Sequence, residues 1–255
     1  MALQIDAIPA FNDNYIWALH NQGCCVLIDP GDSCGPLDFL ARKQLRLCAI
    51  LLTHHHADHV GGVDELLAAH PAPVWGPVDS RMPAASTALR EGDRVGIPEL
   101  DLEFEVIETP GHTRSHIVFF GHDMLFCGDT LFSAGCGRLF EGTAEQMQAS
   151  FDKLAALPDT SRVFCAHEYT QANCRFALRV EPHNAALRSR AEQVRSLREA
   201  GQITLPSTLA AEKSFNPFLR TGNTAVIEAA ARREPGAAAS PASVFGVIRR
   251  WKDLG

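Results

Sequence analysis

Residues 47–59 read LCAILLTHHHADH, an apolar run followed by four histidines and one aspartate. The apolar part, Leu47–Leu52, predicts a buried strand, and the polar part begins where that strand ends. Buried polar side chains without partners cost free energy, so core packing does not explain the cluster. Short histidine-rich tracts typically bind metal ions. The stretch therefore predicts a metal site at the mouth of a strand, with a solvated histidine-rich turn as the alternative.

The spacing inside this cluster indicates an irregular segment. His54, His56, Asp58 and His59 cannot all lie on one face of a regular helix or strand, whereas a loop can direct them to one point. Imidazole and carboxylate ligands suit zinc, iron or manganese. Because no cysteine belongs to the cluster, a closed structural zinc site of the finger type is disfavoured.

Three later segments repeat the pattern of a metal-capable side chain just past a strand. His112 follows the alternating stretch 102–107, Asp129 follows the apolar run 124–127, and His167 follows the short run 163–165. In open α/β arrangements, ligands collect at the ends of strands. Each residue alone is more simply explained as a hydrogen-bonded structural group, but their repetition behind the first cluster favours a shared site.

The composition indicates a soluble globular protein. A chain of 255 residues with 46% hydrophobic and 21% charged residues can bury the core of one large or two smaller domains. Short strand-like runs continue to about Cys165, and the sequence from Tyr169 onward is mostly helical in pattern. A helix is predicted over residues 184–200, since apolar residues recur at helical spacing and Gly201 follows.

Charge and targeting signals exclude several partners. The net charge of −7 gives no general reason to bind nucleic acid, and no apolar run approaches the length of a membrane span. The first fourteen residues lack the basic start and apolar core of a secretory signal. The eight cysteines show no C-x-x-C spacing, so we expect reduced, mostly buried thiols. These features together predict a cytoplasmic protein.

The motif set T-H-H-H-A-D-H, G-H-T, G-D-T and A-H-E resembles that of the metallo-β-lactamase superfamily of hydrolases. Within it, the chain is most similar to the glyoxalase II family. The more specific matches are Asn12–Tyr15, Gly135–Gly142, Phe215–Arg220 and Arg249–Lys252, so the resemblance covers almost the whole chain. It implies a four-layer αββα sandwich over residues 1–168, followed by a helical substrate-binding domain over residues 169–255.

The resemblance also implies a site for two divalent metal ions, with zinc as the first expectation and iron or manganese as alternatives. One ion would be held by His54, His56 and His112, the other by Asp58, His59 and His167, and Asp129 would bridge both. Two ions about 3.5–4 Å apart can share a water and lower its pKa towards neutrality. His55 has no ligand role in the family pattern and is interpreted as a loop residue or as one that supports the ligands without binding metal.

The reaction implied is hydrolysis of S-D-lactoylglutathione and related 2-hydroxyacylglutathiones to the acid and glutathione, the second step of methylglyoxal detoxification. A hydroxide shared by the ions would attack the thioester carbonyl, and Asp58 would act as the catalytic residue that holds its proton. The family pattern assigns substrate binding to Arg138, Tyr169, Arg249 and Lys252. For Arg249 and Lys252 the alternative is the solvated face of a last helix. The expected protein is a monomer.

The chain departs from the family pattern in two segments, and several other functions remain as alternatives. Arg138 and Phe140 stand where the family often has lysine and tyrosine, and Ser115 stands where glycine is usual. A glutathione persulfide dioxygenase or a lactonase of the same superfamily is the alternative function. A nuclease is disfavoured because no basic tract is present, and a non-catalytic metal-binding module does not need seven ligands.

Overall fold

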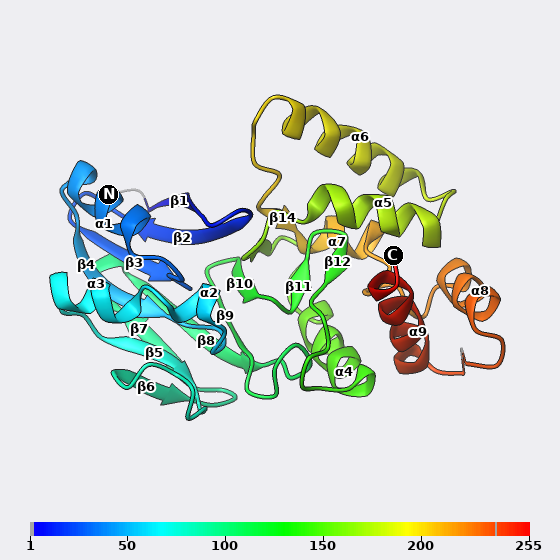
Figure 1. The fold of residues 1–255 in the computed structure, drawn as a ribbon, viewed down its shortest axis with the longest axis horizontal. Coiled ribbons are helices and arrows are strands. Elements are labelled where there is room, and N and C mark those ends of the chain that lie inside the picture. The colour runs from blue at the N-terminus through cyan, green and yellow to red at the C-terminus, as the bar shows by residue number, and fades with distance from the viewer. Residues whose placement is uncertain (1–2, 238) are drawn as a thin grey trace. The chain divides into compact units, whose positions relative to one another are not determined.

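The computed structural model describes residues 3–237 and 239–255, which belong to two compact units (Figure 1). The first unit comprises residues 1–108 and 115–128, and the second comprises residues 109–114 and 129–255. The division therefore interrupts the chain near His112 as well as at Asp129. The domain boundary expected after residue 168 stays a prediction.

The first unit contains two sets of strands, and short helices connect some of these strands along the chain. Its elements in chain order are β1 (Gln4–Ala10), β2 (Asn14–His20), β3 (Cys24–Ile28), α1 (Cys34–Lys43), β4 (Arg46–Leu51), α2 (Ala57–Val60), α3 (Val63–Ala69), β5 (Val74–Pro77), β6 (Ser86–Leu89), β7 (Arg94–Ile97), the 3₁₀ turn η1 (Pro98–Leu100), β8 (Leu102–Glu108), β9 (Ile117–Gly121) and β10 (Met124–Gly128). One sheet has the order β1-β2-β3-β4-β5-β6, and β10-β9-β8-β7 are neighbours in a second sheet.

The sheet that carries β4 explains why residues 47–52 are apolar without alternation. β3, β4, β5 and β6 pair in parallel, whereas β1 and β2 are antiparallel to their neighbours. Strands in parallel sheets are covered on both faces and therefore read as continuous apolar runs. Leu47 to Leu51 are all buried, as that rule requires. The buried strand predicted from this stretch is confirmed.

The segment after β4 combines a loop with one turn of helix. His54, His55 and His56 lie in the loop, as predicted, but Asp58 and His59 belong to α2. The loop prediction is therefore wrong for these two residues, because one helical turn already directs consecutive side chains about 100° apart. Gly31 allows the chain after β3 to pass close by, since a Cβ there would lie 1.9 Å from the carbonyl oxygen of Asp58.

The cysteine prediction needs one correction. Cys24 in β3 and Cys48 in β4 form a disulfide, with their Cα atoms 5.8 Å apart, so they are not the reduced thiols that the spacing suggested. Pairing between neighbouring strands leaves no C-x-x-C signature, because the partners are far apart in sequence. The remaining six cysteines are free, and all but Cys34 are buried.

The second unit is predominantly helical. Its elements are β11 (Leu131–Phe132), β12 (Gly135–Cys136), α4 (Ala144–Ala155), β13 (Arg162–Cys165), α5 (Thr170–Val180), α6 (Ala185–Glu199), β14 (Ser207–Thr208), α7 (Leu209–Phe215), α8 (Thr224–Arg233) and α9 (Pro241–Asp253). β11 and β12 form a two-residue antiparallel hairpin, and β13 pairs with β14.

Local signals fix the helix ends of this unit. Asn184 caps α6 by accepting a hydrogen bond from the Leu187 amide, and Gly201 follows the helix with a φ of +69°. The helix predicted over residues 184–200 is thus confirmed. Ser240 and Ser243 form a reciprocal capping box at the start of α9. No helix within residues 3–237 and 239–255 is long and apolar enough to cross a membrane.

Candidate metal centre and adjoining cavity

The first unit gathers one group of metal-type side chains at the end of β4. His54 and His59 are buried, whereas 41% of the Asp58 side chain is exposed. The Nε2 of His54 lies 3.0 Å from the Nδ1 of His56, and the Nε2 of His59 lies 3.5 Å from the Oδ2 of Asp58. This unit therefore contains two pairs of side chains whose metal-type ligand atoms lie close together.

Buried Asp29 orients both pairs. Its Oδ1 accepts a hydrogen bond from the Thr53 amide at 2.7 Å, and its Oδ2 accepts one from the Thr53 hydroxyl at 2.7 Å. The same Oδ2 lies 3.1 Å from the Nδ1 of His59, and the Thr53 hydroxyl lies 3.1 Å from the Nδ1 of His54. A carboxylate only accepts, so the proton of His59 resides on Nδ1 and its Nε2 keeps a lone pair for a metal.

Asp29 is itself near the metal-type donors of His54 and His59. Its two oxygens, however, already accept hydrogen bonds from Thr53 and His59. These contacts direct both carboxylate oxygens at hydrogen-bond donors. We therefore assign Asp29 to orienting the ligands rather than to binding the ion.

Two further contacts hold the neighbouring side chains. The amide of Asn14 donates to the Oδ2 of Asp58 at 3.0 Å. Ser115, at the position where glycine is usual in the family, donates its hydroxyl to the Oδ2 of Asp79 at 2.7 Å. The Nδ1 of His55 lies 3.6 Å from the same carboxylate, so His55 faces Asp79 within this loop region. Hydrogen bonding from Arg81 holds the pKa of Asp79 well below its usual range.

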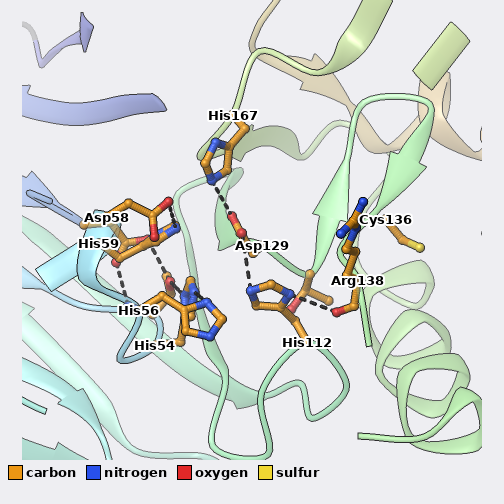
Figure 2. Close-up of polar contacts among 12 residues, drawn as sticks. His54, His56, Asp58, His59, His112, Asp129, Cys136, Arg138 and His167 are labelled. Atoms are coloured by element: carbon orange, nitrogen blue, oxygen red, sulfur yellow. Dashed lines mark hydrogen bonds and ion pairs between the residues drawn. The ribbon is translucent and has the colours of Figure 1, made fainter. Parts of the chain in front are cut away.

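The second unit gathers a matching group around one carboxylate. The Oδ2 of Asp129 lies 3.4 Å from the Nε2 of His112, and its Oδ1 lies 3.2 Å from the Nε2 of His167 (Figure 2). The Nδ1 of His112 donates to the carbonyl oxygen of Arg138 at 2.9 Å, which leaves its Nε2 as an acceptor. Asp129 thus presents a different oxygen to each of two imidazoles.

The spacing of these donors fits metal coordination. Ligand atoms about 2.0–2.2 Å from one ion lie roughly 2.8–3.6 Å apart for angles between 90° and the tetrahedral value. The four donor pairs are separated by 3.0, 3.5, 3.4 and 3.2 Å. Two of these exceed the usual N–H···O distance of about 2.7–3.2 Å. The residues present therefore fit a divalent metal ion. Asp129 presents one oxygen to each of two histidines, which suits a bridging ligand.

A cavity of about 380 Å³ adjoins His112 and Asp129 within the second unit. Three cationic side chains line it, namely Arg138, Arg249 and Lys252, together with the rings of Phe132, Phe140 and Tyr169. Burial lowers the pKa of Lys252 to about 8, with a further contribution from neighbouring Arg249. A cavity of this size is typical of small-ligand sites, and its cations favour an anionic ligand.

Comparison with known proteins identifies the family of the chain. The metallo-β-lactamase superfamily model matches residues 11–167, and a model described as the hydroxyacylglutathione hydrolase C-terminus matches residues 168–254. A hydroxyacylglutathione hydrolase from Pseudomonas fluorescens (strain SBW25) is 52% identical over 255 residues, covering 98% of this chain and 99% of the relative. The chain belongs to the hydroxyacylglutathione hydrolase family. The enzyme of that name from Pseudomonas aeruginosa (strain PAO1) is 51% identical, with 98% and 99% coverage.

Two solved structures extend the comparison. ETHE1 from Myxococcus xanthus is 25% identical and superimposes with a TM-score of 0.66, covering 100% of both chains. A protein solved in a di-iron-bound form is 26% identical, with a TM-score of 0.60, and covers 84% of this chain and 100% of its own. The fold of this hydroxyacylglutathione hydrolase family member is thus the metallo-β-lactamase fold followed by a C-terminal helical domain. The family, together with the histidine and aspartate clusters of this chain, implies divalent metal ions.

The predicted substrate-binding residues lie on one cavity but differ in exposure. Only 4% of Arg249 is exposed, so the alternative of a solvated helix face does not apply to it. Its Nη1 donates to the carbonyl oxygen of Cys136 and its Nη2 to Asp253, both at 2.9 Å. Lys252 donates to the Oδ1 of Asn173. Arg138, in contrast, is largely exposed and lies 3.6 Å from Asp253.

The aromatic positions of the cavity pack against metal-type histidines. The ring of Tyr169 stacks on that of His167, with centroids 4.7 Å apart. Phe140, where the family often has tyrosine, lies edge-on to His112 at 5.3 Å. The departure at residue 140 therefore removes a hydroxyl from a ring that packs against His112.

Sequence reasoning missed Asp29 and Asn173. Asp29 directly follows the apolar strand β3, which is the same signal that identified Asp129. Pro30 and Gly31 follow it, which is typical of a turn, and its φ of +51° shows an irregular backbone there. Asn173 lies inside α5, and nothing in the helical pattern distinguishes it from other polar residues.

Replacing Asp29 with Asn is expected to weaken metal binding about 10- to 100-fold. An amide must direct its NH₂ group at either Thr53 or His59, both of which now donate to Asp29. Asparagine tolerates a positive φ, so the backbone is not strained. Competition with a chromophoric chelator measures the change. Asp32→Asn is the matched control, because Asp32 accepts a hydrogen bond from the Gly35 amide rather than from Thr53 or His59. Equal affinities in both variants would contradict the orienting role.

Proposed function

We propose that this protein is a metal-dependent thioesterase that hydrolyses S-D-lactoylglutathione and related 2-hydroxyacylglutathiones to the hydroxy acid and glutathione. This reaction is the second step of methylglyoxal detoxification. The observation that carries the proposal is one cavity lined both by metal-type His112 and Asp129 and by three cationic side chains. Glutathione thioesters carry two carboxylates, which such cations recognise. Two relatives named hydroxyacylglutathione hydrolase, at 52% and 51% identity, support it.

We further propose two metal ions in each chain. One ion would be held by His54, His56 and His112. The other would be held by Asp58, His59 and His167, and Asp129 would be a ligand of both. The donor spacings within each unit support this set, as does the relative solved in a di-iron-bound form. Zinc is the first expectation, and iron or manganese are the alternatives, because imidazole and carboxylate accept all three.

Divalent ions bound here supply an acidified water and a Lewis acid for the thioester carbonyl. The chain itself contributes Asp58, whose partly exposed carboxylate would hold the proton of the attacking water. Asn14 keeps that carboxylate in place through its 3.0 Å hydrogen bond. A thiol with a pKa of about 8.5 leaves readily as thiolate, so no dedicated general acid is needed.

Substrate recognition would fall to Arg138, Tyr169, Arg249 and Lys252. Arg249 and Lys252 are positioned by contacts with Cys136 and Asn173, so their cations are already directed into one region. The Nε of Arg249 is buried and has no hydrogen-bond partner within residues 3–237 and 239–255. We propose that the functional division of the chain falls after residue 168, with the metal ligands and Arg138 before it and the other three recognition residues after it.

The affinity for a glutathione ligand is expected to fall as the pH rises through about 8, the pKa of Lys252. Below this pKa the ammonium is charged and attracts a carboxylate, and above it the amine is neutral. Calorimetric titration with S-hexylglutathione, a thioether that is not hydrolysed, should show binding weakened about five- to tenfold between pH 7 and 9.

The Lys252→Arg variant is the control for this titration, because arginine stays charged throughout the range. Its affinity should change far less between the two pH values. Identical pH dependence in wild type and variant would contradict the assignment of the effect to Lys252.

The substrate class is tested by a panel of thioesters. Thiol release from S-D-lactoylglutathione should be fast, whereas an S-D-lactoyl thioester of cysteamine, which lacks both carboxylates, should be a poor substrate through a raised KM. Oxygen uptake with glutathione persulfide tests the dioxygenase alternative, and ring opening of lactones tests the lactonase. Equal turnover of both thioesters would contradict recognition of glutathione. The monomeric state and the cytoplasmic location stay predictions from the sequence.

A further inference from the structure

The hairpin β11–β12 forms part of the cavity wall. Phe132 in β11 and Cys136 in β12 both line the cavity. The Phe132 ring lies edge-on to the rings of His167 and Tyr169, at 5.8 and 5.3 Å between centroids. The carbonyl oxygen of Cys136 accepts the hydrogen bond from Arg249. The shape of this hairpin therefore sets the positions of several cavity groups.

The hairpin is too short to hold that shape by itself. Its ladder consists of the pairs Leu131 with Cys136 and Phe132 with Gly135, and isolated hairpins are marginally stable even when longer. Ala134 at the tip is completely buried with a φ of +56°, a conformation that alanine rarely adopts. Something outside the hairpin must therefore stabilise the turn.

Two side chains at the end of α7 supply that support. The amide nitrogen of Asn216 lies 3.0 Å from the carbonyl oxygens of both Phe132 and Gly135. The Oε2 of Glu212, one helical turn earlier, accepts a hydrogen bond from the Ala134 amide at 2.8 Å. Both side chains are completely buried. Glu212 also accepts from Asn216 at 3.1 Å, so the two residues act as one unit.

A third contact links the same turn to the substrate cations. Asn173 of α5 donates its side-chain nitrogen to the carbonyl oxygen of Ser133 at 3.0 Å, and its Oδ1 accepts from Lys252. A displaced turn would therefore shift the partners of Lys252 and of Arg249 together. Glu212 and Asn216 make no contact with the cavity themselves, since neither is among its lining residues.

We propose that Glu212 and Asn216 are positioning residues that hold the β11–β12 hairpin and thereby keep the cavity shaped for glutathione. The inference rests on the proposed function, since it concerns the recognition half of that site. It assigns a role to the start of the Phe215–Arg220 segment, which the chemistry of the metal centre leaves unexplained.

The test is the Asn216→Ala variant, studied as the full-length, metal-loaded protein. Removing the amide leaves two buried carbonyl groups without their donor, and the hairpin should open more often. Hydrogen exchange at residues 131–136 is expected to accelerate about tenfold. KM and the dissociation constant of S-hexylglutathione should each rise about tenfold, while kcat and the metal content change by less than about threefold.

Asn184→Ala is the matched control. Asn216 is the C-cap residue of α7, and Asn184 likewise caps a helix, at the start of α6. The side-chain amide of Asn184 donates to the carbonyl oxygen of Ser214 at 3.0 Å and does not touch the hairpin. This variant should lose thermal stability with wild-type KM and wild-type exchange at residues 131–136. If Asn216→Ala does not fold, Asn216→Leu provides the same comparison, because it fills the side-chain volume but donates no hydrogen bond to the hairpin.

Wild-type KM, ligand affinity and hairpin exchange in the variant would overturn the inference and reduce Asn216 to a structural cap. Faster exchange with unchanged KM and affinity would equally overturn it, because the hairpin would then not control recognition. Failure of the wild-type protein to bind S-hexylglutathione or to hydrolyse the thioester is a separate result, which contradicts the proposed function itself.

Discussion

Asp58→Asn is expected to fold normally and bind metal, yet to lose turnover by roughly 10²- to 10⁴-fold, the usual range for a positioned acid–base group. The side chain is 41% exposed and contributes little to the core, so the cost to stability is small. An amide still offers an oxygen ligand but cannot accept the proton of the attacking water. Steady-state kcat on S-D-lactoylglutathione, divided by bound metal, measures the effect.

Asp64→Asn is the matched control, since Asp64 is an exposed acid in the first turn of nearby α3. It should leave kcat at the wild-type value. Retained turnover in a folded Asp58→Asn protein with a full metal complement would contradict the role of Asp58. Loss of metal together with turnover would instead make Asp58 a ligand alone.

The second large effect is expected from Asp129→Asn. Asp129 presents Oδ2 to His112 and Oδ1 to His167, so one side chain serves both proposed ions. An amide carries no negative charge, and its nitrogen is a poor metal ligand. We expect the bound metal to fall by at least one equivalent per chain and activity to fall on the order of 10³-fold. Elemental analysis after gel filtration gives the stoichiometry.

Asp129→Glu separates charge from geometry. It keeps two oxygens and the negative charge but lengthens the side chain by one methylene, so it should retain more metal than Asp129→Asn. Full metal content and activity in Asp129→Asn would show that the carboxylate does not bridge two ions.

Local elements were the most predictable part of the fold. The buried strand at residues 47–52 follows from an unbroken apolar run, and the helix at 184–200 follows from its periodicity and flanking Asn184 and Gly201. The layer order of the sheets was available only from the family resemblance, because periodicity reports which face of an element is buried and not which element covers it.

The metal-type residues were predictable because chemistry restricts their types and strand ends restrict their places. Their supports were harder to predict. Asp29 contacts Thr53 and His59 across more than twenty residues, and Asn216 reaches the hairpin at Phe132 over more than eighty. No local pattern encodes such contacts. The Cys24–Cys48 disulfide was missed for the same reason, since only strand pairing brings the two residues together.

The account is tested most directly by release of free thiol and D-lactate from S-D-lactoylglutathione, measured before chelation, after removal of metal, and after restoration with zinc, iron or manganese. We expect rapid release by the metal-loaded protein, loss of activity on chelation, and recovery that is complete when two equivalents of metal are bound. A folded protein that binds two metal ions and releases no thiol would contradict the proposed thioesterase, and release that survives full removal of metal would contradict the metal centre.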